Sequence, residues 1–331
     1  MNNVEVAEIL NSVDMFELAS KTVNNAALND TESVAVAELD RRFKEIGKAG
    51  YDKDHEIAAF VEKTVTQEIY NAPDELLDEI FERDSIGEFD DYEAAFLPPK
   101  NTLVAYEAVK GGNVDRSFLD VSVLKPTWKN YQVEFELSFR DVKTNGWKSV
   151  ALFTDYAVAA FKNKMFAEVF NAIDNGILMG AENYIAETSA MPTQASMDKM
   201  ALYLMDQEGD VRNIVGLSKY IQAASKLTNF VSDELINEVN RNGRLGVYDS
   251  CSMVPISSAK KLGSGDLLIP DHRLFGIAGK IGSLTMRGDI TTYEHEDTNK
   301  EKFHFKLAGF NFGYAFNKDT LEKVCVMHLG G

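Results

Sequence analysis

Residues 156–176 carry apolar side chains at every third or fourth position, the spacing that aligns side chains along one face of an α-helix. This face consists of Val158, Phe161, Met165, Val169 and Ile173, whereas Lys162, Glu168 and Asn171 occupy the other side. The pair Asn175-Gly176 predicts a left-handed stop at the end of the helix. A helix with such a continuous apolar face requires an equally apolar surface elsewhere in the chain.

The C-terminal stretch KFHFKLAGFNFGYAF (302–316) predicts that surface. Phe303, Phe305 and Leu307 share one parity, and Phe310, Phe312, Tyr314 and Phe316 share the other. One extra residue at Ala308-Gly309 would return both sets to a common face, which is what a β-bulge does. We therefore predict a long bulged strand, paired with residues 282–296 across the turn DTNKE. The helix at 156–176 is the candidate to cover its aromatic face.

Net charge divides the chain into an acidic first third and a nearly neutral remainder. The whole chain carries −18, and residues 1–95 contain 24 acidic residues against 8 basic ones. Apolar spacing predicts short amphipathic helices around residues 36–46, 57–69 and 76–81. Their apolar faces need a partner surface. Two interpretations remain open, a small helical domain or an arm or scaffold-like segment that packs on neighbouring subunits.

The period of the pattern changes from 3.6 to 2 after Leu97-Pro98-Pro99-Lys100. Residues 117–124 and 131–140 alternate as strands do, with apolar side chains on one face of the second stretch and charged ones on the other. From 211 to 281 short helices and strands alternate irregularly: 211–227 predicts a strand followed by a helix, and 232–243 predicts a further helix that Ser232 caps and Gly243 ends. This order predicts an α+β fold rather than a repeating βαβ sheet.

The sequence lacks the motifs of common catalytic and ligand sites. No GxxxxGK[ST] loop is present, and GSGD at 263–266 does not lead from a strand into a helix. Cys251 and Cys325 lie in apolar, strand-like runs, which favours buried thiols over a disulfide or a metal ligand. We therefore predict no catalytic, cofactor-binding or metal-binding residues, and no cofactor.

Two histidine groupings offer alternatives. The first contains His295, His304, Glu294, Glu296 and Asp297, which a hairpin could bring together as a metal site. Its spacing matches no familiar zinc signature. The second is Asp271-His272, a pair that could belong to a triad, although no serine lies in a GxSxG elbow.

Several partner classes are disfavoured by the same sequence. No apolar run approaches the roughly 20 residues that a membrane span requires. The start, MNNVEVAEILNSVD, lacks the basic and apolar regions of a signal peptide, so a cytoplasmic protein without a membrane partner is expected. The acidic first third disfavours direct binding to a nucleic-acid backbone, because like charges repel.

The order of these parts resembles a tailed-bacteriophage major capsid protein of the Hong Kong 97 type. The resemblance covers about 98–331: a β ribbon, a long helix, a mixed region with GRLGVYDSCSMVPI, and LLIPDHRLFGIAGKIG leading to the terminal hairpin. It implies an acidic helical N-terminal arm or scaffold-like segment at 1–97 and an extended β loop at 98–148. It further implies a peripheral domain, formed by 149–194 and 282–331 with the spine helix and the β hairpin, and an axial domain at 195–281.

The resemblance also implies a function. A major capsid protein self-assembles as pentamers and hexamers into an icosahedral shell around double-stranded DNA, and is not an enzyme. Expected partners are other copies of the chain, portal and scaffolding proteins and a decoration protein, with DNA nearby but not specifically bound. The expected location is the virion capsid, assembled in the host cytoplasm. The alternatives are an encapsulin-like compartment shell and a cytoplasmic enzyme with a site around His272 or His295.

Overall fold

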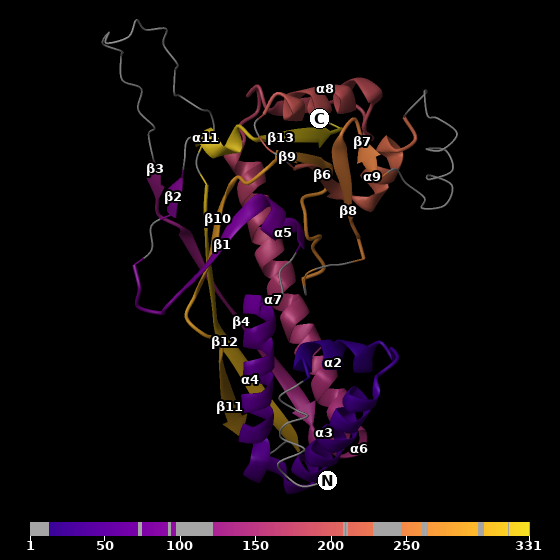
Figure 1. Ribbon diagram of the computed structural model, residues 1–331, viewed down its shortest axis with the longest axis vertical. Coiled ribbons are helices and arrows are strands. Elements are labelled where there is room, and N and C mark those ends of the chain that lie inside the picture. The colour runs from indigo at the N-terminus through magenta and orange to yellow at the C-terminus, as the bar shows by residue number, and fades with distance from the viewer. Residues whose placement is uncertain are drawn as a thin grey trace, which may run out of the picture.

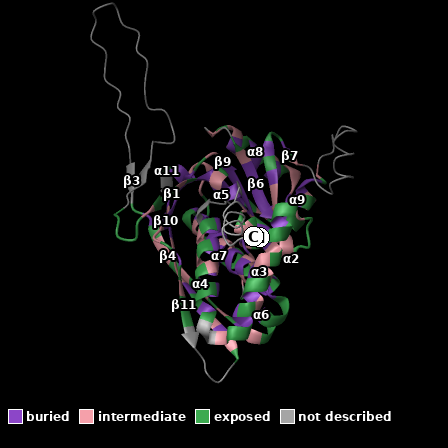
Figure 2. Ribbon diagram, turned by 60° about the horizontal axis from the view of Figure 1, so that its bottom comes forward, coloured by how far each residue is buried: buried purple, intermediate pink, exposed green. Residues whose placement is uncertain are grey.

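The computed structural model describes residues 13–71, 75–91, 94–96, 122–207, 209, 211–227, 246–259, 262, 264–296, 301–316 and 318–330. The predicted strand at 117–121, the helix at 232–243 and the turn at 297–300 lie outside these residues. One long helix, α7 (Trp147–Gly176), extends from the N-terminal helices and a first β-sheet to a second β-sheet at the other end (Figure 1). Buried residues concentrate along this helix and in the strands of the second sheet (Figure 2).

Helix α7 is longer than the predicted helix because it begins at Trp147 rather than near residue 156. Gly146, with φ of +50°, separates it from the short helix α6 (Phe139–Asn145). All five residues of the predicted apolar face are buried. The predicted left-handed stop is wrong, since Gly176 is the last helical residue and has no positive φ. An added Cβ at Gly176 would lie 2.7 Å from Leu321 Cδ1, the end of a flexible side chain that would have to shift.

The first sheet is built on the long strand β12 (Lys302–Ala315). Along one edge, β10 (Gly282–Arg287) and β11 (Thr291–Glu296) pair antiparallel with successive parts of β12. Along its other edge lies β4 (Thr127–Ser138), also antiparallel. The predicted pairing of the C-terminal strand with residues 282–296 is confirmed.

The predicted bulge is also confirmed. The register between β4 and β12 shifts between Leu307 and Phe310, and Gly309 has φ of +87°. As a result Phe303, Phe305, Leu307, Phe310 and Phe312 are all buried. One inserted residue therefore keeps these five side chains on the side that faces the core, and Tyr314 and Phe316 beyond them are partly buried.

We expect Gly309→Ala to destabilise the fold by about 1–3 kcal/mol through backbone strain, and further through a clash. An added Cβ would lie 2.7 Å from the Asp289 carbonyl oxygen. Gly180→Ala is the matched control, because Gly180 has a similar φ of +84° with nothing within 4 Å of the added atom. Chemical denaturation of both variants measures the difference, and equal losses would show that the contact with Asp289 is unimportant.

The second sheet has the order β5-β13-β9-β6-β8-β7. Its strands are β5 (Tyr184–Glu187), β6 (Arg212–Leu217), β7 (Val247–Tyr248), β8 (Cys251–Ile256), β9 (Arg273–Ala278) and β13 (Val324–Leu329). Helix α8 (Gln194–Met205) packs on β9 and β13, and α9 (Ser218–Ala224) packs on β6 and β8. The predicted strand-then-helix order at 211–227 is confirmed by β6 and α9. With mixed parallel and antiparallel pairing, this is the α+β arrangement expected from the sequence.

The described part of the acidic first third, up to residue 91, forms helices and the strand β1. Its elements are α2 (Met15–Val23), α3 (Asp30–Ala49), η1 (Gly50–Lys53), α4 (Asp54–Asn71), α5 (Glu75–Ile80) and β1 (Phe81–Ile86). The three helices predicted there are present, except that Phe81 begins a strand. Shorter elements complete the described chain: β2 (Ala94–Phe96), β3 (Ser122–Leu124) and α11 (Lys318–Leu321).

Candidate functional site

Helix α7 joins the two sheets through aromatic contacts. Near its middle, the Phe161 ring centroid lies 4.6 Å from that of Phe310 in β12. Further along, α7 contacts the second sheet, where the ring centroids of Phe170 and Phe275 of β9 lie 5.2 Å apart. Aromatic pairs at these separations add to the stabilisation from burial alone. The prediction that this helix covers the aromatic strand is confirmed, and the helix also fixes one sheet relative to the other.

The helices of the acidic segment pack against α7 of their own chain. The Trp147 ring lies 6.0 Å from the ring of Phe43 in α3 and 5.4 Å from that of Phe60 in α4. Its indole Nε1 donates a hydrogen bond of 3.0 Å to the Thr22 hydroxyl in α2. The first turn of α7 therefore contacts α2, α3 and α4.

A nearly buried ion pair connects α4 to the middle of α7. Lys162 Nζ lies 2.6 Å from Glu68 Oε1, and the Glu68 side chain is 9% exposed. Burial raises the pKa of Glu68, and the hydrogen bond from Lys162 opposes that rise without cancelling it. Breaking such a pair by removing one partner is strongly destabilising, because the remaining charge stays desolvated.

The segment also contributes to the first sheet. Strand β1 pairs in parallel with β10, from Phe81 opposite Gly282 to Ile86 opposite Arg287. Glu62 of α4 accepts a hydrogen bond of 2.6 Å from the backbone N–H of Thr292 in β11. The described part of the acidic segment therefore covers a helix and extends a sheet of its own chain.

The sequence alone could not show that the acidic helices pack on α7 of their own chain. A separate small helical domain and an arm on neighbouring subunits were equally compatible with it. An amphipathic face shows that a helix must be covered, but it does not show whether the cover is in the same chain. Residues such as Thr22, Glu62 and Glu68 gave no signal, because single polar residues on short helices are usually solvated. Trp147 offered a partial signal, since it is one of only 2 tryptophans in the chain.

The Asp271-His272 pair is part of an ion-pair cluster. Asp271 Oδ1 accepts a hydrogen bond of 2.7 Å from the Tyr220 hydroxyl and lies 2.7 Å from Lys219 Nζ. The His272 backbone N–H donates to the same oxygen at 2.8 Å. Desolvation would raise the pKa of Asp271, but the donors outweigh it and lower the pKa to about 2. The arrangement holds the carboxylate ionised and joins α9 to the turn before β9.

We expect Asp271→Asn to remove a pH-dependent part of the stability. A carboxyl whose folded pKa is depressed stabilises the fold above its unfolded pKa, and this contribution disappears as the pH falls from about 4 to about 2. Because the Asp271 side chain is 39% exposed, we discount the contribution to about 1 kcal/mol. Denaturation at pH 7 and pH 2.5 measures it. A difference between wild type and variant that is the same at both pH values would contradict this assignment.

The hairpin brings the two histidines of the other grouping together. His295 lies opposite His304 in the β11–β12 register. His304 Nε2 is 3.4 Å from Glu136 Oε1 of β4. Within the part of the chain that the structure describes, no group of three or more histidine, cysteine or acidic side chains is placed to hold a metal ion.

Both cysteines are free and buried, as predicted. Burial raises the pKa of Cys251 to about 11 and that of Cys325 to about 12. A thiol with such a pKa is almost entirely protonated near neutral pH and is a poor nucleophile. Among the described helices, none combines the length and apolarity needed to cross a membrane.

The described chain is thus an α+β protein with one long helix between two sheets and an N-terminal segment packed on the helix. No family model and no curated protein sequence matches it. Among solved structures, the capsid of an empty GTA particle is 11% identical, with 77% of this chain and 89% of that chain covered at a TM-score of 0.51. A chain of Gordonia phage Cozz is 12% identical, covering 75% and 85% at 0.50.

A third structure, from Microbacterium phage Oxtober96, is 11% identical, with 76% of this chain and 90% of that chain covered at a TM-score of 0.50. The likeness to these structures extends over most of both chains. The chain therefore has the Hong Kong 97-type fold of phage capsid proteins. The fold expected from the order of sequence elements is confirmed.

Proposed function

We propose that this chain is the major capsid protein of a tailed bacteriophage and assembles as pentamers and hexamers into an icosahedral shell around double-stranded DNA. The observation that carries the proposal is the fold, which matches capsid structures over about three quarters of the chain. Its role is structural rather than enzymatic. The partners are other copies of the chain, with portal, scaffolding and decoration proteins, in a capsid assembled in the host cytoplasm.

In this proposal each part of the chain has a mechanical role. Residues 98–148 include an extended loop that reaches a neighbouring subunit, and 195–281 form an axial domain whose loops meet around the symmetry axes. Residues 149–194 and 282–331 form the peripheral domain, in which α7 is a rigid beam. Many moderate contacts of this kind make a shell strong although each contact is weak.

The acidic first third has a different role from a removable scaffold. Its contacts with Trp147 and Lys162, together with the β1–β10 pairing, favour a segment that stays with the folded subunit. The charge of the chain, −18, also suits the proximity of packed DNA, because a surface that attracted phosphates would hinder packaging.

Electron microscopy and light scattering of the full chain, concentrated near physiological salt, test the proposal. We expect closed or partial shells, or rings of five and six subunits. Co-expression with candidate scaffolding proteins extends the test to assembly that needs a helper. Monodisperse small particles under both conditions would contradict the shell function.

A further inference from the structure

Phe89 is an aromatic side chain displayed at the tip of a constrained turn. It is 91% exposed, although aromatic side chains of this size are normally mostly buried. The turn follows β1, and the residues that flank Phe89 in the sequence, Glu88, Asp90 and Asp91, are also exposed. In both ribbon views this turn lies at the outer edge of the first sheet, away from α2 and α3 (Figures 1 and 2).

The turn is held by hydrogen bonds that leave the ring free. The Asp90 carboxylate accepts a bond of 3.0 Å from the Gly87 N–H, and the Asp90 N–H donates to the Gly87 carbonyl at 3.2 Å. Arg287 of β10 donates to the carbonyl oxygens of Glu88 and Asp90 at 2.8 and 3.2 Å. The guanidinium of Arg287 lies 5.2 Å from the Trp128 ring of β4. A preorganised aromatic side chain loses little conformational freedom when a partner binds it.

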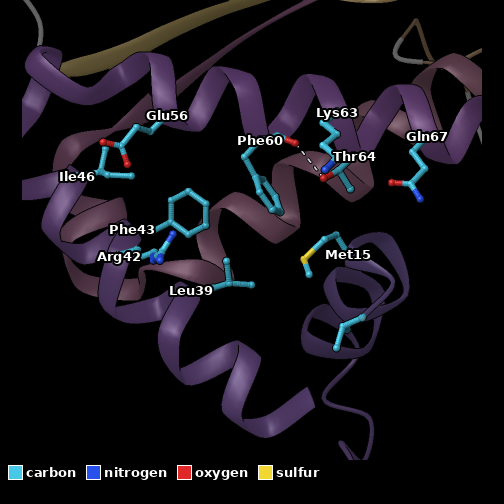
Figure 3. Close-up of a pocket in the computed structure, with 11 residues that line it drawn as sticks. Met15, Leu39, Arg42, Phe43, Ile46, Glu56, Phe60, Lys63, Thr64 and Gln67 are labelled. Carbon is cyan, nitrogen blue, oxygen red and sulfur yellow. Dashed lines mark hydrogen bonds between the residues drawn. The ribbon is translucent and has the colours of Figure 1, made fainter. Parts of the chain in front are cut away.

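A pocket of matching character lies between the N-terminal helices. It has a volume of about 380 Å³, and its apolar wall includes Met15, Leu39, Phe43, Ile46 and Phe60 (Figure 3). The pocket formed by these residues and their polar neighbours is called here the helical pocket. Phe43 and Phe60 meet edge to face at 5.4 Å, and Trp147 of α7 packs against both rings, so this wall of the pocket is aromatic and firmly held.

The charges around the helical pocket complement those around Phe89. Its charged lining residues are Arg42 and Lys63, both exposed, and one carboxylate, Glu56; Arg42 also pairs with Glu38 of its own helix at 3.0 Å. Two basic side chains on one pocket are uncommon in residues 1–95, where acidic residues outnumber basic ones by 24 to 8. The turn is acidic, with Glu88, Asp90 and Asp91 flanking Phe89 in the sequence. Complementary charge of this kind directs association and disfavours wrong partners.

We propose that Phe89 of one subunit inserts into the helical pocket of a second copy of this chain. The inference rests on the proposed shell function, since it requires subunits in contact. Because the turn and the pocket lie on different parts of the surface, the contact is head-to-tail, and contacts of that type generate rings. Phe89 would serve as the buried aromatic anchor, and the surrounding charges would set its orientation.

Cysteine cross-linking in the full-length protein tests the contact directly. Chains carrying Glu88→Cys and chains carrying Lys63→Cys are mixed, concentrated and oxidised. The native cysteines are both buried, so they contribute little background. We expect a disulfide dimer that contains one chain of each type and forms only in the mixture. Glu88→Cys mixed with Val247→Cys is the control, since Val247 is also exposed (57%) but lies on β7 of the second sheet.

Assembly of variants provides the second measurement. Phe89→Ala should keep the wild-type melting temperature and raise the subunit concentration needed for assembly by at least about tenfold. Glu88→Lys and Lys63→Glu should each weaken assembly, and the double variant should recover it. Wild-type shells with neither the cross-link nor an effect of Phe89→Ala would overturn this inference but not the shell function.

The two proposals can fail separately. Cross-linked oligomers without shells or rings would support the contact and count against the shell. Absence of both would overturn both. A Phe89→Ala variant that assembles normally but loses binding of a different phage protein would assign the turn to that protein and overturn the contact between copies.

Discussion

A subunit in which Phe161 is replaced by aspartate should fail to fold. Phe161 is 1% exposed and its ring packs 4.6 Å from that of Phe310, at the contact between α7 and the first sheet. Losing a buried phenylalanine costs about 3–5 kcal/mol, and burying a carboxylate adds several more. The sum is comparable with the whole stability of a typical domain, about 5–15 kcal/mol.

Soluble yield, circular dichroism and thermal unfolding measure the effect of Phe161→Asp. Asn171→Asp is the matched control, because it adds the same charge to an exposed position of the same helix. Its expected effect is within about 0.5 kcal/mol of zero. A soluble Phe161→Asp subunit with a wild-type melting temperature would show that α7 does not pack on the first sheet through Phe161.

Deletion of residues 1–86 should also prevent folding, rather than only assembly. The deletion uncovers Trp147, leaves Lys162 without Glu68, and removes the β1 strand from β10. The uncovered apolar surface of α7 and the newly unpaired edge of β10 would favour aggregation. The expected result is an insoluble or proteolysed fragment, measured by soluble yield and limited proteolysis.

Deletion of residues 1–12 is the control for that experiment, since it keeps every helix and strand described here. We expect this shorter deletion to fold. A soluble, cooperatively unfolding chain that lacks residues 1–86 would instead show that the acidic segment is separable, as a scaffold removed during maturation would be. Comparing the two deletions therefore shows whether the acidic segment is needed for the subunit to fold or can be removed from it.

The sequence predicted local structure best where a pattern was long. The apolar face from Val158 to Ile173 and the parity change at Ala308-Gly309 determined the helix and the bulged strand, because helix and strand have fixed periods of 3.6 and 2. The end of α7 was predicted wrongly because a glycine does not by itself specify a positive φ. Gly309 has φ of +87°, whereas Gly176 continues the helix as its last residue.

The candidate assembly surfaces could be predicted only in part. The order of elements was sufficient to indicate the capsid fold, but it did not place Phe89 at the tip of a constrained turn. That placement depends on Arg287, which is far away in the sequence and becomes a neighbour only through the β1–β10 pairing. A contact of this kind leaves no periodic signal.

The sequence alone determined the main helices and strands, although not all their ends, and which of their faces must be covered, because these properties depend on neighbours a few residues apart. Only the tertiary structure decided what covers them. The acidic helices face α7 of their own chain, Glu68 meets Lys162, and β1 completes the first sheet. Such pairings join residues distant in sequence, and apolar burial, the main force behind them, has no direction that a single sequence could reveal.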